Sequence, residues 1–301
     1  MFVIKYKKIF IGISVVLMAL SIVGLLTWGL KIGIDFKGGS MTEVVYTDGL
    51  PDVRVMEEKI LELDYGSVVV QPIGDGGLSI KTRDLTEAEH QALLDTLSED
   101  GSLKMEERSF TSIGPSVGKE LKTKSVISLV IVALTMIIFV AYAFRKVAKP
   151  VSSWKYGLIV VAALIHDVIL TAGVFTLISH FTGAEADTLF VVALLTVLGL
   201  SVNDTIVVFD RVRENLTNKI SHEFSTVVGK SLNQTMLRSL NTSLSVIIVL
   251  IALFIFGPDS TRIFALTLAC GMFFGTYSSI FIASPLLVIV EGWQKKKEAA
   301  Q

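Results

Sequence analysis

The sequence predicts a multi-pass α-helical membrane protein with six transmembrane helices and one α+β domain outside the membrane. Two observations lead to this fold class. The 301 residues are 51% hydrophobic and 18% charged, whereas a soluble domain carries about 25% charged residues. Apolar runs long enough to cross a hydrocarbon core of about 30 Å occur six times, at 9–30, 125–144, 156–179, 188–209, 239–256 and 263–290. This composition argues against a cytosolic enzyme.

Basic residues lie almost entirely on one side of the predicted spans. Fourteen occupy the two chain ends and two loops on that side, whereas the short loops 180–187 and 257–262 on the other side carry only Arg262. Cytoplasmic loops are enriched in Lys and Arg, so we expect both termini in the cytoplasm. The fourteen are Lys5, Lys7, Lys8, Arg145, Lys146, Lys149, Lys155, Arg211, Arg213, Lys219, Lys230, Lys295, Lys296 and Lys297. The first run is too long for a signal-peptide core and lacks a small-residue cleavage site, so we expect an uncleaved anchor.

The spans divide the chain into four predicted parts. Residues 1–30 form the cytoplasmic N-terminus and first transmembrane helix, 31–124 an extracytoplasmic domain, 125–291 a five-helix transmembrane region and 292–301 a basic cytoplasmic tail. The segment 31–124 carries 18 acidic and 11 basic residues, a net charge of −7, which leaves +6 for the remainder. The near-neutral total of −1 therefore combines two segments of opposite sign.

Residues 31–124 contain four strand-like and two helix-like segments. Segment 41–47 is rich in β-branched residues, and segment 51–63 has helical spacing after a Pro-Asp start. Segments 67–73 and 78–83 predict a hairpin across Gly74-Asp75-Gly76-Gly77. Segment 85–97 predicts a helix whose N-cap Thr86 and third residue Glu89 form a capping box, and 103–111 predicts a last strand. The order β-α-β-β-α-β is the ferredoxin-like one, with two helices on one face of a four-stranded sheet, and nothing in it is typical of catalysis.

Helical spacing also predicts which residues of the two short helices face the core. In the first helix Val55, Ile60 and Leu63 can share a face. In the second helix the residues with this spacing are Ala88, Leu93, Leu94 and Leu97.

Two glycine-containing segments flank the predicted domain. Gly38 and Gly39 end segment 33–39, which predicts either a tight turn between the first helix and the sheet or a hinge. Segment 114–120 superficially resembles a phosphate-binding loop, but only three residues separate Gly114 from Gly118 and Glu120 replaces the required Ser or Thr. We therefore expect a connector to the second span and no nucleotide site.

Metal and redox chemistry have little support in the sequence. The single Cys270 cannot form an intrachain disulfide or a cysteine zinc site. His90, His166, His180 and His222 are dispersed and form no pattern typical of metal ligands. We expect no metal and no cofactor.

Three ionisable residues inside the predicted spans are the strongest chemical signal. Asp167 falls near the middle of the third span, and Asp204 lies about 24 Å along the fourth span from its outer end. Arg238 begins the fifth span about 28 Å from Gly257, at a depth similar to that of Asp204. A charged side chain in a bilayer costs at least a few kcal/mol and usually marks an ion or proton pathway. Making and breaking an Asp204–Arg238 contact would load and unload a proton. The alternatives are a permanent ion pair that holds the helices in register, or an Asp167 carboxyl group that is satisfied by a neighbouring hydroxyl.

Five segments together resemble a known family. They are 33–39 (GIDFKGG), 113–121 (IGPSVGKEL), 166–167 (HD), 198–215 (LGLSVNDTIVVFDRVREN) and 238–243 (RSLNTS). In this order and topology they resemble the SecD/SecF family of bacterial protein-export membrane proteins, allied to the resistance-nodulation-division transporters. The resemblance runs from the first span to the sixth, and the six spans match a separate subunit rather than the fused SecDF form.

This resemblance implies a function, a set of partners and roles for the membrane residues. It implies an auxiliary subunit that, with its homologous partner SecD, uses the proton-motive force to complete preprotein export through the SecYEG channel, often with YajC. Its substrate would be unfolded preprotein, its location the bacterial cytoplasmic membrane, and no nucleic acid would be bound. By position, Asp204 would be the proton-relay carboxylate and Arg238 its gating partner, while Asp167 matches a polar position of the family. A proton-coupled exporter of small molecules or ions and a passive scaffold are the alternatives, and the coupling ion, H⁺ or Na⁺, is left open.

Overall fold

The computed structural model describes residues 2–74, 76–144 and 151–298 in two units. The helical unit comprises Met1–Lys31, Ile127–Ala184 and Leu189–Gln301, and the α+β unit comprises Ile32–Val126 and Glu185–Thr188. Several residues of the sequence predictions lie outside the described part: Asp75 of the hairpin, the loop residues Arg145, Lys146 and Lys149, and the end of the tail, 299–301.

Within the described residues, six helical segments are long and apolar enough to cross a membrane. They are α2 (Lys7–Thr27), α6 (Pro115–Ala143), α7 (Ser153–Thr182), α8 (Thr188–Thr217), α9 (Phe224–Phe256) and the continuous run of α10 (Asp259–Ser278), η1 (Ser279–Ala283) and α11 (Ser284–Glu298). A short α1 (Phe2–Lys5) precedes them. The six-span prediction is confirmed, with the helix class and number as expected.

The helices differ from the predicted spans mainly at their polar ends. α6 begins at Pro115, so segment 114–120, expected as a connector, is the first part of a helix. α8 extends beyond the predicted span to Thr217, and α9 begins before its predicted span, at Phe224. These polar extensions remain helical and still contain a few buried apolar side chains, among them Val212 and Val228. The π-helical turn η1 was not predicted, since no apolar pattern distinguishes it from an α-helix.

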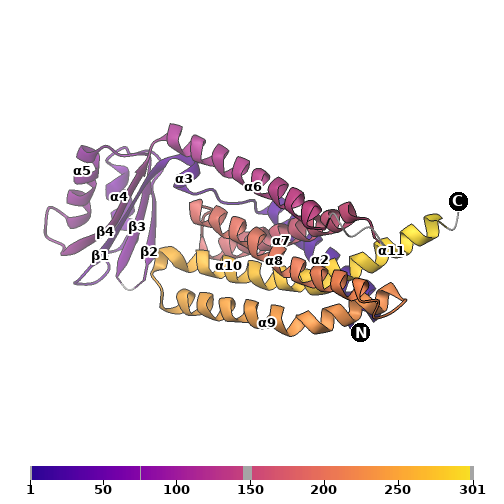
Figure 1. Ribbon diagram of the computed structural model, residues 1–301. Coiled ribbons are helices and arrows are strands. Elements are labelled where there is room, and N and C mark those ends of the chain that lie inside the picture. The colour runs from indigo at the N-terminus through magenta and orange to yellow at the C-terminus, as the bar shows by residue number, and fades with distance from the viewer. Residues whose placement is uncertain (1, 75, 145–150, 299–301) are drawn as a thin grey trace. The chain divides into compact units, whose positions relative to one another are not determined.

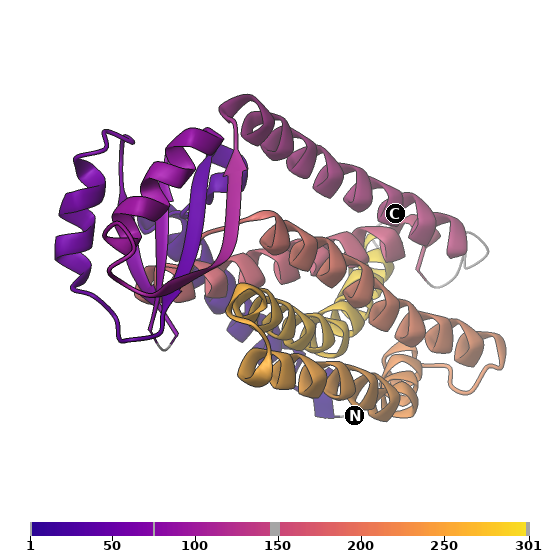
Figure 2. The same ribbon diagram turned by 90° about the vertical axis from the view of Figure 1, so that its left-hand side faces the viewer.

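Close packing in the helical unit depends on two glycines of α10. A Cβ atom at Gly271 would lie 2.1 Å from Cγ2 of Val197 on α8, and one at Gly275 would lie 3.0 Å from Cβ of Ser201. The small residues Gly271 and Gly275 therefore let α10 contact α8 directly. Figures 1 and 2 show α10 running beside α9 as well.

The α+β unit has the predicted βαββαβ order. Its elements are α3 (Ile34–Lys37), β1 (Gly39–Tyr46), α4 (Val53–Leu61), β2 (Val69–Ile73), β3 (Gly77–Thr82), α5 (Glu87–Ser98) and β4 (Met105–Ile113). The sheet order is β2-β3-β1-β4 and all neighbours are antiparallel, with a bulge between Glu43 and Val44 of β1. Helices α4 and α5 cover one face of this sheet (Figure 1).

The core of this unit lies between the sheet and the two helices. The buried side chains are Val44, Tyr46, Met56, Ile60, Tyr65, Leu78, Ile80, Leu85, Leu93 and Leu97. Two core predictions were wrong: Val55 and Ala88 are exposed, and Met56 and His90 are buried in their helices instead. The other predicted residues were right: Ile60, Leu93 and Leu97 are buried in the core, and Leu63 and Leu94 pack against it.

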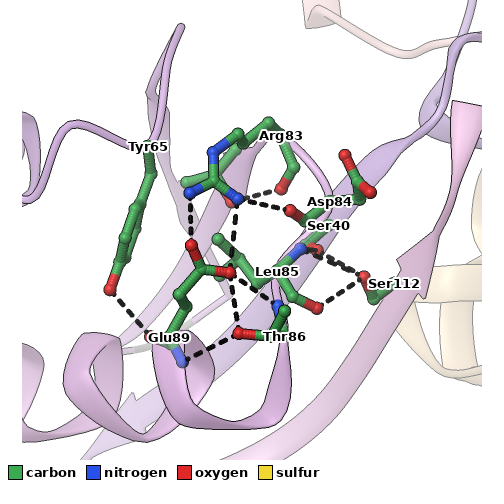
Figure 3. A network of polar contacts seen from close by, with 9 residues as sticks. Ser40, Tyr65, Arg83, Asp84, Leu85, Thr86, Glu89 and Ser112 are labelled. Carbon is green, nitrogen blue, oxygen red and sulfur yellow. Dashed lines mark hydrogen bonds and ion pairs between the residues drawn. The ribbon is translucent and has the colours of Figure 1, made fainter.

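The predicted capping box at the start of α5 is present and is extended by an arginine. Thr86 Oγ1 accepts from the Glu89 backbone N–H at 3.4 Å, and the Glu89 carboxylate accepts from the Thr86 N–H at 2.8 Å and binds Arg83 (Figure 3). The ion pair with Arg83, followed by the hydrogen bonds from Thr86, lowers the pKa of Glu89 to about 2. Beside it, Ser112 and Ser40 hydrogen-bond to the backbone of Leu85, which ties the start of α5 to β1 and β4 (Figure 3).

Candidate functional site

Asp204 lies in the interior of the helical unit, on α8. Its side chain is 6% exposed. Its Oδ2 accepts hydrogen bonds from the hydroxyl of Ser243 on α9 at 3.2 Å and from that of Thr276 on α10 at 3.3 Å, and the two hydroxyl oxygens lie 2.5 Å apart. A hydroxyl both donates and accepts, so this shell can hydrogen-bond to a carboxylate and to a neutral carboxylic acid.

Asp167 on α7 is held more tightly. Its side chain is 0% exposed. Its Oδ1 lies 2.9 Å from Nδ1 of His166, and its Oδ2 accepts from Ser201 on α8 at 2.5 Å and from Ser278 on α10 at 2.8 Å. Nε2 of His166 is buried without a hydrogen-bond partner, and the ring lies near that of Tyr277. Asp167 therefore joins three helices through one carboxyl group.

The end of α10 connects the two aspartates. Thr276 bonds to Asp204, Ser278 bonds to Asp167, and Ser279 lies 2.8 Å from the hydroxyl of Thr205 on α8. Ser279 begins the π-helical turn η1, and π-turns inside helices often occur at functional sites. The α10 partners of the two aspartates, Thr276 and Ser278, are thus only two residues apart.

Arg238 does not meet Asp204 in this structure. Its side chain is exposed, and it forms no ion pair with either buried aspartate. Ser243 of α9 bonds to Asp204, and Ser239, one turn earlier, is buried on the same side; both residues are 2% exposed. Arg238 is one residue from Ser239 and therefore points about 100° away from it. Arg238 lies on the same exposed side of α9 as Asn241, Thr242 and Ser245.

Two of the predicted turn and connector glycines, Gly38 and Gly118, pack against each other in the α+β unit. Gly38 has φ of 81° and Gly39 has φ of 137°, a region that favours glycine. A Cβ atom at Gly118 would lie 2.8 Å from the backbone nitrogen of Gly38, so the start of α6 needs glycine at this point. Around Gly114 there is open space.

The described residues contain no group of three or more His, Cys, Asp or Glu side chains that could hold a metal ion. Asp204 bonds to hydroxyls of Ser and Thr, and Asp167 to two Ser hydroxyls and the ring of His166. The arrangement is suited to binding and releasing a proton at a carboxyl group.

Comparison with known proteins agrees with the arrangement of spans and domain. Residues 93–293 match the family described as "Protein export membrane protein SecD/SecF, C-terminal". The chain belongs to the SecD/SecF family. It is 36% identical over 307 residues to the "Protein translocase subunit SecF" of Thermobaculum terrenum, covering 98% of this chain and 94% of the relative. It is 37% identical over 273 residues to the subunit of the same name from Synechocystis sp., covering 88% and 84%.

A solved member of the SecD/SecF family shares the fold. The crystal structure of SecDF from Thermus thermophilus, titled "a translocon-associated membrane protein", superposes with a TM-score of 0.81 at 28% identity. The match covers 97% of this chain but only 38% of that SecDF chain, so this chain spans less than half of its length. A second SecDF structure, in the "Super-membrane-facing form", gives a TM-score of 0.70.

The sequence offered, as one alternative, a hydroxyl partner for Asp167, and Ser201 and Ser278 supply it. It did not identify these two residues, nor the hydroxyls beside Asp204. Ser201 lies three residues before Asp204, and Ser243 ends the segment 238–243, so both were inside segments already singled out. Thr276, Ser278 and Ser279 form a polar cluster in an otherwise apolar span, which was the available signal. Their acceptors lie on other helices, and no pattern within one span identifies those.

Proposed function

We propose that this chain is the SecF-type auxiliary subunit of the Sec protein translocase. With a SecD partner it uses the proton-motive force to promote the late stages of preprotein export across the bacterial cytoplasmic membrane, and it catalyses no covalent reaction. Two relatives named as translocase subunits, each matching more than four fifths of its length, support the translocase role. The observation that carries the proton-coupled part is Asp204, a buried carboxyl group inside a membrane-spanning helix with hydroxyl partners only.

In this proposal Asp204 binds and releases the proton, and the hydroxyls of Ser243 and Thr276 accommodate both forms. The ionised form accepts hydrogen bonds from both hydroxyls, and the neutral form donates one to a hydroxyl oxygen. A charged carboxylate in the bilayer costs at least a few kcal/mol, so protonation changes the preferred packing of α8 against α9 and α10. Asp167 belongs to the same relay, because Ser278 and Thr276 bring both carboxyl groups to one stretch of α10.

Arg238 acts as the gating partner of Asp204 in another state of the cycle. For Arg238 to point in the direction that Ser239 now does, α9 must rotate by about 100°, or the Arg238 side chain must adopt another rotamer that reaches around the helix. Exposure of Arg238 in the present state leaves it free for such a movement.

The proposed location and partners follow from charge and from the relatives. We place both termini in the cytoplasm and the α+β unit outside it, since basic residues cluster at the opposite ends of the helices. Labelling of a cysteine introduced as Ser102→Cys by a membrane-impermeant maleimide in spheroplasts tests this orientation, and protection there refutes it. SecYEG, YajC and unfolded preprotein complete the proposed set, and the description of SecDF as translocon-associated supports the first.

Replacement of Asp204 tests the proposed function. Asp204→Asn keeps the size and hydrogen-bonding capacity of the side chain but cannot release a proton. We expect loss of proton-motive-force-dependent export of a model preprotein in inverted membrane vesicles, with normal co-purification of the SecD partner. Asp210→Asn is the matched control: it lies on the same helix, but its side chain is exposed and pairs with Arg213 at 3.0 Å.

Full export by the Asp204→Asn variant would refute the proton-relay role. Loss of SecD co-purification would instead assign Asp204 to assembly. Transport of a small molecule by the chain reconstituted alone would favour the exporter alternative.

A further inference from the structure

The short segment between α7 and α8 folds with the α+β unit rather than with the helices that it joins. Residues Glu185–Thr188 belong to that unit. Ala186 forms a parallel β-bridge with Ile32, and its carbonyl accepts from the N–H of Gly33 at 2.9 Å. The Glu185 carboxylate pairs with Nζ of Lys81 on β3 at 3.0 Å. This segment is therefore attached to the α+β unit by backbone and side-chain contacts.

Asp35 extends this attachment to the first residue of α8. Asp35 lies on α3, within segment 33–39, and its Oδ2 accepts a hydrogen bond from the backbone N–H of Thr188 at 2.8 Å. The first N–H groups of a helix have no partner within the helix, so a carboxylate there both satisfies a donor and favours the helix dipole. The start of α8 is thus fixed to the α+β unit by a side chain that is distant in sequence.

Segment 33–39, which contains Asp35, also contacts the start of α6. A Cβ atom at Gly38 would lie 2.8 Å from Cα of Pro115, the first residue of α6, and one at Gly118 would reach the Gly38 nitrogen. Segment 33–39 therefore packs closely against the start of one membrane-spanning helix and caps another.

We propose that Asp35 is a positioning residue that couples the α+β unit to Asp204 by holding the start of α8. α8 is continuous from Thr188 to Thr217, and Asp204 lies sixteen residues along it, about 24 Å of helical rise. An axial shift of this helix moves Asp204 relative to Ser243 and Thr276, which belong to other helices. Movement of the α+β unit is thereby transmitted to the carboxyl group, and protonation there is transmitted back. This inference rests on the proposed function of Asp204.

Variants at Asp35 and a matched cap elsewhere in the same unit test the coupling. Asp35→Ala removes the acceptor, whereas Asp35→Asn keeps an oxygen that accepts the same N–H, since Asn caps helices as well as Asp does. Asp52→Ala is the control: Asp52 caps α4 in the same way, accepting from the Arg54 N–H at 2.9 Å, but α4 does not continue into a membrane span. The assay is export of a model preprotein by membrane vesicles with the complete translocase, with and without a proton-motive force.

We expect Asp35→Ala to lower the proton-motive-force-dependent part of export at least about fivefold, the lower limit of typical coupling between sites. The amount of assembled subunit and the export that remains without a proton-motive force should be unchanged. Asp35→Asn should stay within about twofold of the parent, and Asp52→Ala should equal it.

Asp204→Asn, measured in parallel, separates the two ideas. If Asp204→Asn exports normally, the proposed function fails and the coupling has no site to act on. If Asp204→Asn is defective while Asp35→Ala equals Asp52→Ala, the coupling is refuted and the proposed function stands. A defect in Asp35→Asn as large as in Asp35→Ala also refutes it, because capping would then not be the property that matters.

Discussion

Ser278→Ala is the sharpest test of how Asp167 is held. The substitution removes one of the three groups that hydrogen-bond to a carboxyl group with no solvent exposure, and it leaves His166 and Ser201 in place. A hydrogen bond to a charged group contributes about 1.5–3 kcal/mol, whereas hydrogen bonds between transmembrane helices average about 0.6 kcal/mol. Because three donors converge on Asp167, we expect the larger value.

This loss converts into a measurable shift of the melting temperature. For a unit of this size, 1 kcal/mol corresponds to about 2–4 °C, so the expected decrease is roughly 3–12 °C. Cys270, the single cysteine, lies half-buried on α10 close to Ser278 in sequence. Its reaction with a thiol-sensitive fluorophore during heating of the full chain in detergent reports unfolding of this region without an introduced cysteine.

Ser245→Ala is the matched control, because its exposed hydroxyl bonds only to the Asn241 carbonyl of its own helix at 2.7 Å. We expect a decrease below about 1 °C. If Ser278→Ala lowers the melting temperature no more than the control does, the reasoning is refuted. A decrease of only about 1–2 °C would mean that Asp167 is a neutral acid. In an Asp167→Asn background the effect of Ser278→Ala should shrink, since the two groups share one interaction.

Two further predictions concern packing and acid stability. Gly271→Leu should destabilise the helical unit by about 1–3 kcal/mol or more in the same melting assay, because even the Cβ atom of the new side chain would overlap Val197. Gly12→Leu is the control and should have little effect, because there is open space around Gly12. Equal effects of the two substitutions would contradict the close packing of α10 against α8. The pKa of Glu89, lowered to about 2 by Arg83, means that its stabilising effect on α5 is present above about pH 4.5 and is lost as the pH falls toward 2. Amide exchange of α5, corrected for intrinsic rates, should therefore rise in acid in the parent, and Glu89→Gln should remove most of this pH dependence; an identical acid response would exclude the ion pair as its cause.

The membrane spans and the βαββαβ order could be predicted because both depend on local patterns. A span needs about twenty apolar residues whatever surrounds it, and Thr86 with Glu89 forms a capping box from four consecutive positions. The predicted faces of α4 and α5 were right at Ile60, Leu93 and Leu97 but wrong at the first turn, where Met56 is buried in place of Val55, because neighbouring apolar residues satisfy the helical pattern nearly equally well.

Contacts between distant segments could not be predicted in this way. Asp204 and Arg238 lie at matched depth, but depth does not determine which side of a helix faces a neighbour, and Ser243 occupies the position next to the carboxyl group. The cap that Asp35 places on α8 joins residues 153 positions apart in the chain.

The number of spans follows from the sequence because hydropathy acts on each segment independently, and five segments of the sequence indicate the family. The sequence also places Asp167 and Asp204 within two of these spans. Tertiary packing brings hydroxyls of α8, α9 and α10 to the two carboxyl groups, turns Arg238 outward and attaches the start of α8 to the α+β unit. These features depend on the rotation and register of one helix against another, and such choices are made by side-chain packing between segments that no local pattern connects.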